Sequence, residues 1–543
     1  MSTDNQATEK QESNEHKVIN EHKVINRPKM ERFTMLLERA QYGLKQYQHD
    51  GVAWCVRNEL QQTSSNGNGG TSSNGGTSSK GGIIADEMGL GKTLMMIGVM
   101  FVNLKKRTLI VLPPVLLDQW VAEIYKCSGH IALVYHGQNV KTITDEELAR
   151  APIVLTTYSM LNPKKNTEIA NTRLHKIIWN RIIFDEAHHL RNKKTTRYKS
   201  CKALRSKVRW LVTGTPVQNK RSDFFNLCNI IGIKVDQDNF AEVIQNNILR
   251  RTKTDVGILL PPVLNHCQTI NWSNIHEKRL AEEIHSCLPN QTYVTGANCN
   301  GLLSQRLGEK GVLLAILRAR QSCILPALIK PSTKGLNDPE YKQGTKYSSK
   351  LDGVLQTILD RKDNGNGKII FCNFRQEIDF VAERLRRGGM QKVVTFDGRN
   401  SKNGLKTLSD AADAIVLQIQ TGCEGLNLQK NYSEIYFISP HWNPSIEDQA
   451  VARCHRIGQE KPTNVFKFEM NGFDKAHKAQ PIQQQGQQEE GEQGQQEEEE
   501  EEEQGQQEEE EEEETPDPIT LEKYVNKVQQ IKRDISSEFI KHN

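Results

Sequence analysis

Short runs of apolar residues, four or five residues long, recur along the chain in two groups, and helix-like spacing of apolar residues separates the runs. Strands that are apolar throughout are typical of parallel sheets covered by helices on both faces. The pattern therefore predicts an α/β fold with two lobes. The runs are Thr108–Leu112, Ile153–Thr156, Arg181–Asp185 and Arg209–Thr213, then Lys368–Cys372, Lys392–Phe396, Ala414–Gln418, Glu434–Ile438 and Asn464–Phe468.

Helical patterning fills the rest. Residues 225–350 lack strand-like runs and carry helical spacing, as in Gly311–Ile329. Near the end, Ile519–Ile540 places apolar residues at three- and four-residue steps, which predicts an amphipathic helix. Thr520 can cap its first turn, and Pro518 stands just before it.

Three low-complexity segments interrupt these patterns. The polar N-terminal residues include the sequence EHKVIN twice in succession, residues 63–82 are rich in Gly, Ser and Asn, and residues 483–514 contain only Gln, Glu and Gly. Such segments cannot bury a core and are expected to be disordered. The predicted organisation is a disordered tail at 1–39, lobe one at 40–255, a helical protrusion at 256–350, lobe two at 351–475, an acidic insertion at 476–518 and a final helix at 519–543.

The net charge of the chain outside the acidic segment is strongly positive. The acidic segment contains 17 of the 67 acidic residues, so the remaining chain carries 71 basic and 50 acidic residues, a balance of +21. That balance favours a polyanionic partner such as nucleic acid, because each neutralised phosphate releases counterions. Lysines spread over the surface for solubility alone are the other interpretation. The acidic segment itself is either solvated filler, a mimic of DNA that restrains the protein, or a site for basic proteins.

The cysteines and the hydropathy indicate where the protein works. The 11 cysteines are scattered singly, with no C-x-x-C pair. There is no N-terminal apolar segment to act as a signal peptide, and no apolar run approaches the ~18 residues of a membrane span. We expect reduced thiols, no zinc module, no membrane partner, and an intracellular rather than secreted protein.

The sequence Ala85–Thr93 is the strongest chemical signal, and it follows the short apolar run Ile83–Ala85. Its Gly-x-Gly-Lys-Thr ending lets backbone N–H groups wrap a phosphate, Lys92 can reach the β/γ-phosphates, and the Thr93 hydroxyl can bind Mg²⁺. The strict phosphate-loop pattern has glycine where this chain has Asp86. The predicted ATP-binding residues here are Asp86, Glu87, Met88, Gly89, Leu90, Gly91, Lys92 and Thr93.

Two further groups complete a hydrolytic site. Asp185 ends the run Arg181–Asp185 and Glu186 follows it; Asp185 can hold Mg²⁺, and Glu186 can orient or deprotonate the attacking water. Arg453 and Arg456 are three residues apart, on one face of a helix, and can stabilise charge on the γ-phosphate.

These motifs, in this order, resemble the Swi/Snf-type ATPases of helicase superfamily two, whose fold is a pair of RecA-like lobes. The signatures Leu249–Lys253 (LRRTK), Trp442–Pro444 (WNP) and His455–Gln459 (HRIGQ) are specific to that family. The other matching segments are Leu44–Trp54, Asp86–Thr93, Asp185–His188, Thr213–Pro216 with Gln218 and Asn219, Leu317–Ile329, Gly425–Leu428 and Ile519–Asp534.

The resemblance implies further roles. Gln48 would read adenine, and Thr213, Thr215 and Gln449 would couple hydrolysis to nucleic-acid contact. Contacts to the nucleic acid would come from Pro113, Thr156, Thr157, Asn373, Thr421, Gly422 and Trp442. One departure is Thr421–Gly425, where Cys423 stands in place of a glycine and Glu424 adds a charge.

The implied function is ATP-dependent translocation on double-stranded DNA, acting on chromatin or other protein–DNA complexes in a nucleus or at a viral replication site. A strand-separating DEAH-type RNA or DNA helicase is the alternative. A non-enzymatic scaffold would predict the loss of Lys92, Glu186 or Arg456, and all three are present.

Overall fold

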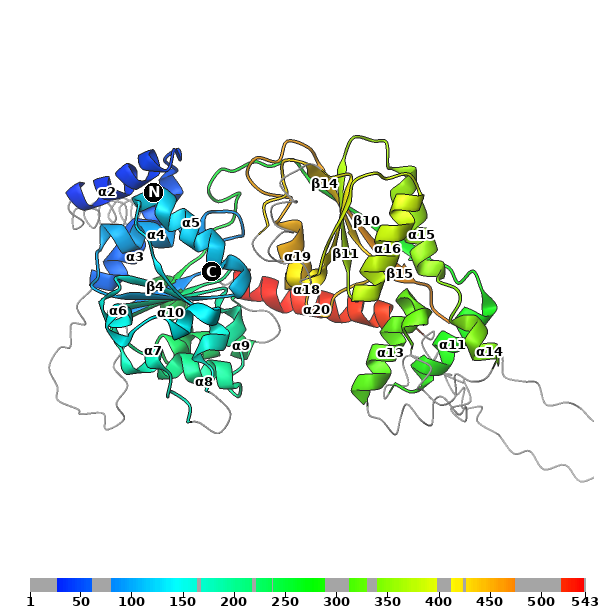
Figure 1. Ribbon diagram of the computed structural model, residues 1–543, viewed down its shortest axis with the longest axis horizontal. Helices are drawn as coiled ribbons and strands as arrows, with labels where there is room; N and C mark the ends of the chain where they lie inside the picture. The colour runs from blue at the N-terminus through cyan, green and yellow to red at the C-terminus, as the bar shows by residue number, and fades with distance from the viewer. Residues whose placement is uncertain are drawn as a thin grey trace, which may run out of the picture.

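A computed structural model gives the fold (Figure 1). The structure describes residues 27–60, 80–163, 168–216, 221–236, 238–288, 312–329, 339–397, 412–422, 426–473 and 519–541. Two α/β bodies lie side by side, and the C-terminal helix α20 (Leu521–Lys541, red) runs beneath the second body and ends at the edge of the first. The predicted α/β class with two parallel-sheet lobes is confirmed. The duplicated EHKVIN segment, most of the predicted linker and the acidic segment fall outside the described residues.

The first lobe is built on a seven-stranded sheet in the order β3-β4-β2-β6-β8-β1-β9, in which every pair is parallel. All five residues of β2, β4 and β6 are buried, as their apolar runs predict. The strands are β1 (Lys80–Ile84), β2 (Thr108–Leu112), β3 (Leu133–Tyr135), β4 (Ile153–Thr157), β6 (Arg181–Asp185), β8 (Val208–Val212) and β9 (Ile248–Leu249), beside a small pair, β5 (Ile178–Trp179) and β7 (Arg205–Ser206).

Helices cover both faces of this sheet, each over its own apolar core. They are α2 (Arg27–Arg39), α3 (Gln46–Leu60), α4 (Lys92–Val102), α5 (Leu117–Ser128), α6 (Asp145–Arg150), α7 (Arg173–Lys176), α8 (Thr196–Ala203), α9 (Arg221–Ile230) and α10 (Phe240–Asn247), with the 3-10 turn η5 (Ala187–Leu190) after β6.

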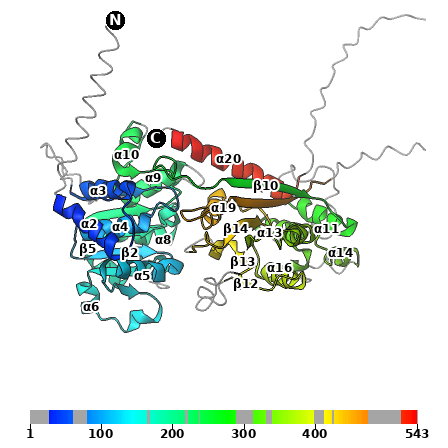
Figure 2. The same cartoon turned by 90° about the horizontal axis from the view of Figure 1, so that it is seen from above.

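The second lobe has a six-stranded parallel sheet in the order β10-β15-β14-β11-β13-β12. Its strands are β10 (Val263–Ile270), β11 (Gly367–Cys372), β12 (Val393–Phe396), β13 (Ala414–Gln418), β14 (Tyr432–Phe437) and β15 (Thr463–Met470). Its helices are α15 (Ser349–Asp360), α16 (Arg375–Arg387), α18 (Ile419–Gly422) and α19 (Pro444–Val451), and α11 (Ile275–Ser286), α13 (Val312–Ile324) and α14 (Pro339–Gly344) form a helical group at its far end (Figure 2).

Three predicted boundaries are wrong. Residues 225–350 are not purely helical, because Val263–Ile270 forms edge strand β10, whose exposed and half-buried residues hide it from a search for continuous apolar runs. The tail 1–39 contains helix α2, in which Phe33 and Leu37 are buried against the first lobe. The last residues of the predicted linker 63–82 belong to strand β1.

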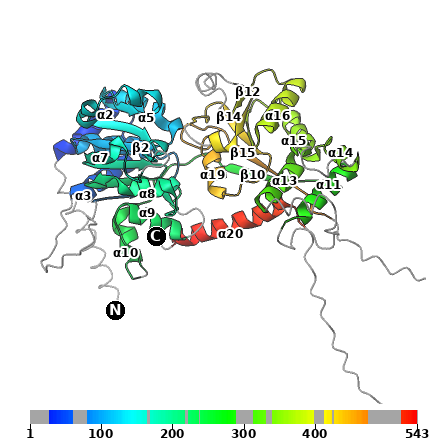
Figure 3. The same ribbon diagram turned by 60° about the horizontal axis from the view of Figure 1, so that its bottom comes forward.

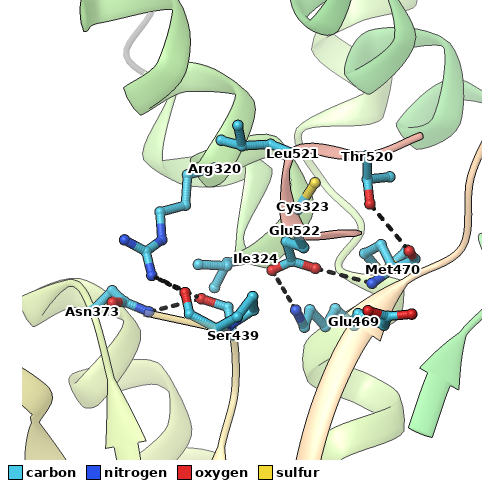
Figure 4. A network of polar contacts seen from close by, with 12 residues as sticks. Arg320, Cys323, Ile324, Asn373, Ser439, Glu469, Met470, Thr520, Leu521 and Glu522 are labelled. Atoms are coloured by element: carbon cyan, nitrogen blue, oxygen red, sulfur yellow. Dashed lines mark hydrogen bonds and ion pairs between the residues drawn. The ribbon is translucent and has the colours of Figure 1, made fainter. Parts of the chain in front are cut away.

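Helix α20, predicted as Ile519–Ile540, is confirmed and is anchored at both ends. Glu522 forms a buried ion pair with Lys350, and its other oxygen accepts the Met470 N–H at 2.9 Å (Figure 4). Near the other end, Ile535 packs against the core of the first lobe. Figure 3 shows the helix leaving the α11–α13 group and reaching α9 and α10. The helix therefore contacts both lobes.

One buried ion pair joins the helices of the first lobe to its sheet. Arg181 on β6 donates to both carboxylate oxygens of Glu59 on α3, at 2.6 and 2.5 Å, and both side chains are 0% exposed. The indole of Trp210 on β8 donates to the same carboxylate at 2.9 Å. Removing one member leaves an uncompensated buried charge, which costs far more than losing a surface pair.

We expect Glu59→Ala to lower the free energy of unfolding by about 3–5 kcal/mol. Urea titration followed by tryptophan fluorescence measures the change. The matched control is Glu146→Ala, which breaks the exposed 3.7 Å pair with Arg150 and should change stability by less than about 0.5 kcal/mol. Equal effects of the two substitutions would contradict this account of the first lobe.

Candidate active site

The phosphate loop connects β1 to α4, which begins at Lys92. Gly89 and Gly91 have φ of 92° and 83°, a region that residues with a Cβ rarely adopt. Lys92 Nζ donates to the carbonyls of Asp86 and Glu87, at 2.8 and 3.2 Å, so its side chain folds back over the loop. The loop and the first turn of α4 thus present the N–H groups and ammonium charge that bind phosphate.

Two residues for which the sequence analysis gave no role hold this loop in place. Arg251 donates to both carboxylate oxygens of Asp86, with Nε–Oδ1 at 3.1 Å and Nη2–Oδ2 at 2.5 Å. Lys253 reaches Glu87 through its ammonium at 2.5 Å and through its backbone N–H at 2.7 Å. The LRRTK signature therefore binds the phosphate loop, which explains why Asp86 stands where the strict pattern has glycine.

Gln48 lies against the loop. Its side-chain amide donates to the carbonyl of Leu90 at 3.1 Å, and a Cβ built on Gly91 would be 2.5 Å from Gln48 Nε2. The neighbouring cavity of about 770 Å³ is lined instead by Tyr47, Trp54 and, from the second lobe, Ile457. The lining also includes charged side chains such as Arg57 and Arg251, so the cavity offers aromatic rings for a nucleotide base beside cations for its phosphates. The sequence motif marks the right place, but the predicted adenine contact of Gln48 stays a prediction.

The acidic pair lies at the C-terminal end of β6. Asp185 accepts a hydrogen bond from the indole N–H of Trp120 at 2.7 Å and from the backbone N–H of Glu186 at 2.9 Å. Glu186 has φ of 48°, a strained left-handed conformation that is typical of functional positions. Its carboxylate lies 3.2 Å from His188 Nδ1. The strand end thus aims two carboxylates at the phosphate loop.

The pKa values of the Asp185 and Glu186 carboxyl groups shift in opposite directions. Burial and the charge of Glu186 raise the pKa of Asp185. Burial also acts to raise the pKa of Glu186, but His188, Lys92 and Arg453 outweigh it and lower that pKa. Glu186 is therefore ionised at neutral pH and able to accept a proton.

The proposed coupling segment after β8 touches the same loop. Thr213 is 1% exposed, its N–H binds the carbonyl of Ile84 at 3.0 Å, and its hydroxyl accepts the Thr215 N–H at 3.2 Å. A Cβ on Gly214 would be 2.9 Å from Met88 and 3.5 Å from Lys92 Nζ. The segment therefore packs directly against the phosphate loop, with no room for a side chain at Gly214. Gln218 and Asn219 fall outside the described residues.

Arginines of the second lobe reach the site in the first. A Cβ on Gly89 would be 3.5 Å from the Cβ of Arg456, whose guanidinium donates to the side chain of Asn427. The charge of Arg453 lowers the pKa of both Lys92 and Glu186. Within the described residues, Arg453 Nε is buried and has no hydrogen-bond partner, so a donor is available to a ligand. The structure brings both predicted arginines to the phosphate loop.

The protein residues that the resemblance predicts to contact nucleic acid differ in how exposed they are. Thr156 and Thr157 are 0% exposed and bind Tyr135, His136 and Ser159, so this conformation excludes contact through their side chains. Pro113 is also buried, at the end of β2. The sequence motif predicts which strand end faces a ligand, but it does not predict which side-chain atoms are exposed there.

The second-lobe residues of this group lie closer to the surface. Asn373 is half-buried and donates to the Ser439 hydroxyl at 2.8 Å. Trp442 is half-buried and packs edge-on against Tyr524 of α20, with ring centroids 6.5 Å apart. Thr421 and Gly422 belong to α18, and the departure at Cys423–Gly425 lies outside the described residues. Among the described residues, no helix is long and apolar enough to cross a membrane.

Because the second lobe completes the nucleotide site of the first, the molecule is a two-lobed ATPase of the RecA-like class. The SNF2-related domain model matches residues 47–239, and the helicase conserved C-terminal domain model matches residues 349–458. The chain belongs to the Swi/Snf family of helicase superfamily two and is a nucleic-acid-dependent ATPase.

Curated relatives agree with this assignment. A "Probable global transactivator" of Orgyia pseudotsugata multicapsid polyhedrosis virus is 28% identical over 475 residues, covering 80% of this chain and 89% of that protein. The ISWI chromatin-remodeling complex ATPase ISW2 of Saccharomyces cerevisiae is 27% identical, with 78% and 38% covered. The ATP-dependent DNA helicase DDM1 of Arabidopsis thaliana is 28% identical, with 78% and 58% covered. The chain thus spans most of the viral relative and about half or less of the two larger ones.

Two solved structures are also similar. The Sulfolobus solfataricus SWI2/SNF2 ATPase core in complex with dsDNA is 26% identical, with a TM-score of 0.35 and coverage of 79% of this chain and 88% of that chain. The Pyrococcus furiosus Hef helicase domain is 17% identical, with a TM-score of 0.46 and coverage of 79% and 96%. The family assignment rests on the sequence matches.

The contact between Asp86 and Arg251 yields a prediction that runs against the motif. Asp86→Gly restores the strict phosphate-loop pattern, yet we expect it to weaken ATP binding and lower the melting temperature, because Arg251 loses its partner. Titration with a fluorescent ATP analogue and thermal unfolding measure the two effects. Adding Arg251→Ala to Asp86→Gly should cost less than the sum of the single substitutions, and strict additivity would contradict the pairing.

Glu186→Gln should retain ATP binding and lose hydrolysis by about 10²–10⁴-fold, the usual contribution of a positioned base. Because its pKa is lowered, Glu186 is already ionised at pH 5, so wild-type kcat should show no fall caused by this group between pH 8 and pH 5. Steady-state rates across this range, with Glu186→Gln as the comparison, test both statements. A variant that hydrolyses ATP normally would remove Glu186 from the mechanism.

Proposed function

We propose that this protein hydrolyses ATP to move along double-stranded DNA and thereby shifts or removes proteins bound to it, nucleosomes included. The observation that carries the proposal is the approach of Arg456, from the second lobe, to Gly89 in the phosphate loop of the first. A nucleotide bound there touches both lobes, so each round of binding and release changes the fit between them.

Mg²⁺ is the proposed metal partner of the nucleotide. The Thr93 hydroxyl and the Asp185 carboxylate supply oxygen donors of the kind that Mg²⁺ prefers, with phosphate oxygens and water completing its shell. The metal would neutralise charge on the transferring phosphate. Asp185 is suited to this position because Trp120 and the Glu186 N–H fix its two oxygens. The described residues contain no group of three or more His, Cys, Asp or Glu side chains that could hold a metal without the nucleotide.

The remaining site residues have separate roles in ATP hydrolysis. Lys92 and the loop N–H groups bind the phosphates, and the ionised Glu186 accepts the proton of the attacking water. Arg453 and Arg456 place positive charge where negative charge develops on the γ-phosphate. Without the second lobe these two charges are missing, so hydrolysis depends on how the lobes meet.

Duplex DNA is the proposed track for two reasons. Outside the acidic segment the chain carries a balance of +21, which favours a polyanion. Its relatives include proteins described as a chromatin-remodeling complex ATPase and an ATP-dependent DNA helicase. A motor of this kind would work where DNA is packaged or copied, in a nucleus or at a viral replication site. A strand-separating helicase is the second candidate, favoured only by the Asp185–His188 motif.

We expect duplex DNA to stimulate ATP hydrolysis more than single-stranded DNA or duplex RNA of equal length does. Lys92→Ala should abolish the activity with every nucleic acid, because it removes the phosphate-binding charge. Phosphate release assays at one salt concentration measure the rates. Stimulation mainly by single strands or by RNA would overturn the translocase proposal in favour of the unwinding helicase.

A further inference from the structure

A second cavity, of about 620 Å³, lies where the two lobes and helix α20 meet. The segment after β6 contributes His188, Arg191 and Arg197, the second lobe contributes Trp442 and Gln449, and α20 contributes Lys532. It is distinct from the base cavity beside Tyr47, because the two have no lining residue in common.

The lining of this junction cavity is positively charged. It includes the cations of Arg191, Arg197 and Lys532, and no aspartate or glutamate is among the described residues that line it. Burial lowers the pKa of Lys532 and the charge of Arg191 lowers it further, while Asp223 on α9 acts in the opposite direction. Like charges held this close favour the binding of an anion.

Two donors at the cavity lack an acceptor. Gln449 is 3% exposed, and within the described part of the chain its amide nitrogen Nε2 has no hydrogen-bond partner. The same holds for Arg197 Nε. Buried donors are rarely left unsatisfied in a native protein. The amide nitrogen of Gln449 is therefore available to donate to an anion in the cavity.

Lys532 is held over the cavity by the packing of α20. The helix is fixed at Glu522, ten residues earlier and about 15 Å away along the axis. Between these positions, Gln529 donates to Glu447 at 2.7 Å. Lys532 Nζ itself donates to the carbonyl of Trp442 at 2.7 Å, and Arg533 pairs with Asp448 at 2.9 Å. The ammonium is thus positioned before any ligand arrives.

We propose that the junction cavity binds a phosphate group of the nucleic-acid backbone, with Lys532 and Arg197 supplying charge and Gln449 a hydrogen bond. The inference rests on the proposed function. Gln420, which also lines the cavity, is adjacent in α18 to Thr421, where nucleic-acid contact is expected. On the other side, His188 lies 3.2 Å from Glu186, so an occupied cavity would adjoin the catalytic carboxylate.

The test is Lys532→Gln in the full chain, measured by duplex DNA binding over a range of salt concentrations. Losing one phosphate contact should reduce the slope of log K against log [salt] by about 0.9 and weaken binding roughly fivefold to tenfold at 0.1 M salt. Lys532→Arg, which keeps the charge, should bind like the wild type. The matched control is Lys527→Gln, on an exposed position of the same helix, which should leave slope and affinity unchanged.

Each outcome of this experiment supports or overturns the proposed phosphate site. If Lys532→Gln has the slope and affinity of Lys527→Gln, the proposed phosphate site is wrong. If inorganic phosphate raises the melting temperature of the wild type but not of Lys532→Gln, while the DNA slope is the same in both, the cavity binds free phosphate and the nucleic-acid assignment is overturned. If wild-type protein binds no duplex at any salt concentration, the proposed function itself fails. Equal melting temperatures without DNA or phosphate show that Lys532→Gln is folded.

Discussion

The ion pairs that join Arg251 to Asp86 and Lys253 to Glu87 are the constraint on which the rest of the arrangement depends. The chain leaves the sheet of the first lobe at β9 and enters the sheet of the second at β10, so residues 250–262 are the direct connection between the lobes. By binding the phosphate loop, this connection fixes where the second lobe starts relative to the nucleotide. The carboxylates of Asp86 and Glu87, at the start of the loop, therefore hold the interlobe connection in place as well as belonging to the predicted ATP-binding segment.

This constraint also helps to explain why the predicted nucleotide site lies between the two lobes. Parallel strands bring their carboxyl ends to one edge, which places the phosphate loop, Asp185 and Thr213 together. None of these residues supplies positive charge on the far side of a bound γ-phosphate. Arg453 and Arg456, in the segment after α19, are the cations that the second lobe brings toward this edge, where a Cβ on Gly89 would be 3.5 Å from the Cβ of Arg456.

The sequence predicts much of this architecture because the chemistry is local. The strands named from apolar runs all appear within two residues of their predicted bounds, since continuous burial leaves an unambiguous pattern. Strand β10 was missed because it lies at a sheet edge and all its residues are exposed or only half-buried. Helix α2 was missed because three buried residues, Met30, Phe33 and Leu37, are a weak signal in a polar segment.

The partners of the site residues were not predictable in the same way. Arg251 binds Asp86 across 165 residues, and Trp120 binds Asp185 across 65, separations at which no periodicity carries information. The family signature marked Arg251 and Lys253 as specific without giving them a role. Exposure was equally hidden, since Thr156 and Thr157 lie at the expected strand end but point inward.

The buried pair of Lys350 and Glu522 also has a consequence for synthesis. The two residues are 172 positions apart, and the lysine is made first. At about 5–20 residues per second, roughly 10–30 s pass before its counter-ion leaves the ribosome. A lysine that is 0% exposed in the finished protein cannot be buried alone during that time. The packing around Lys350 is therefore completed only after α20 has been made, and the ammonium keeps its water until then.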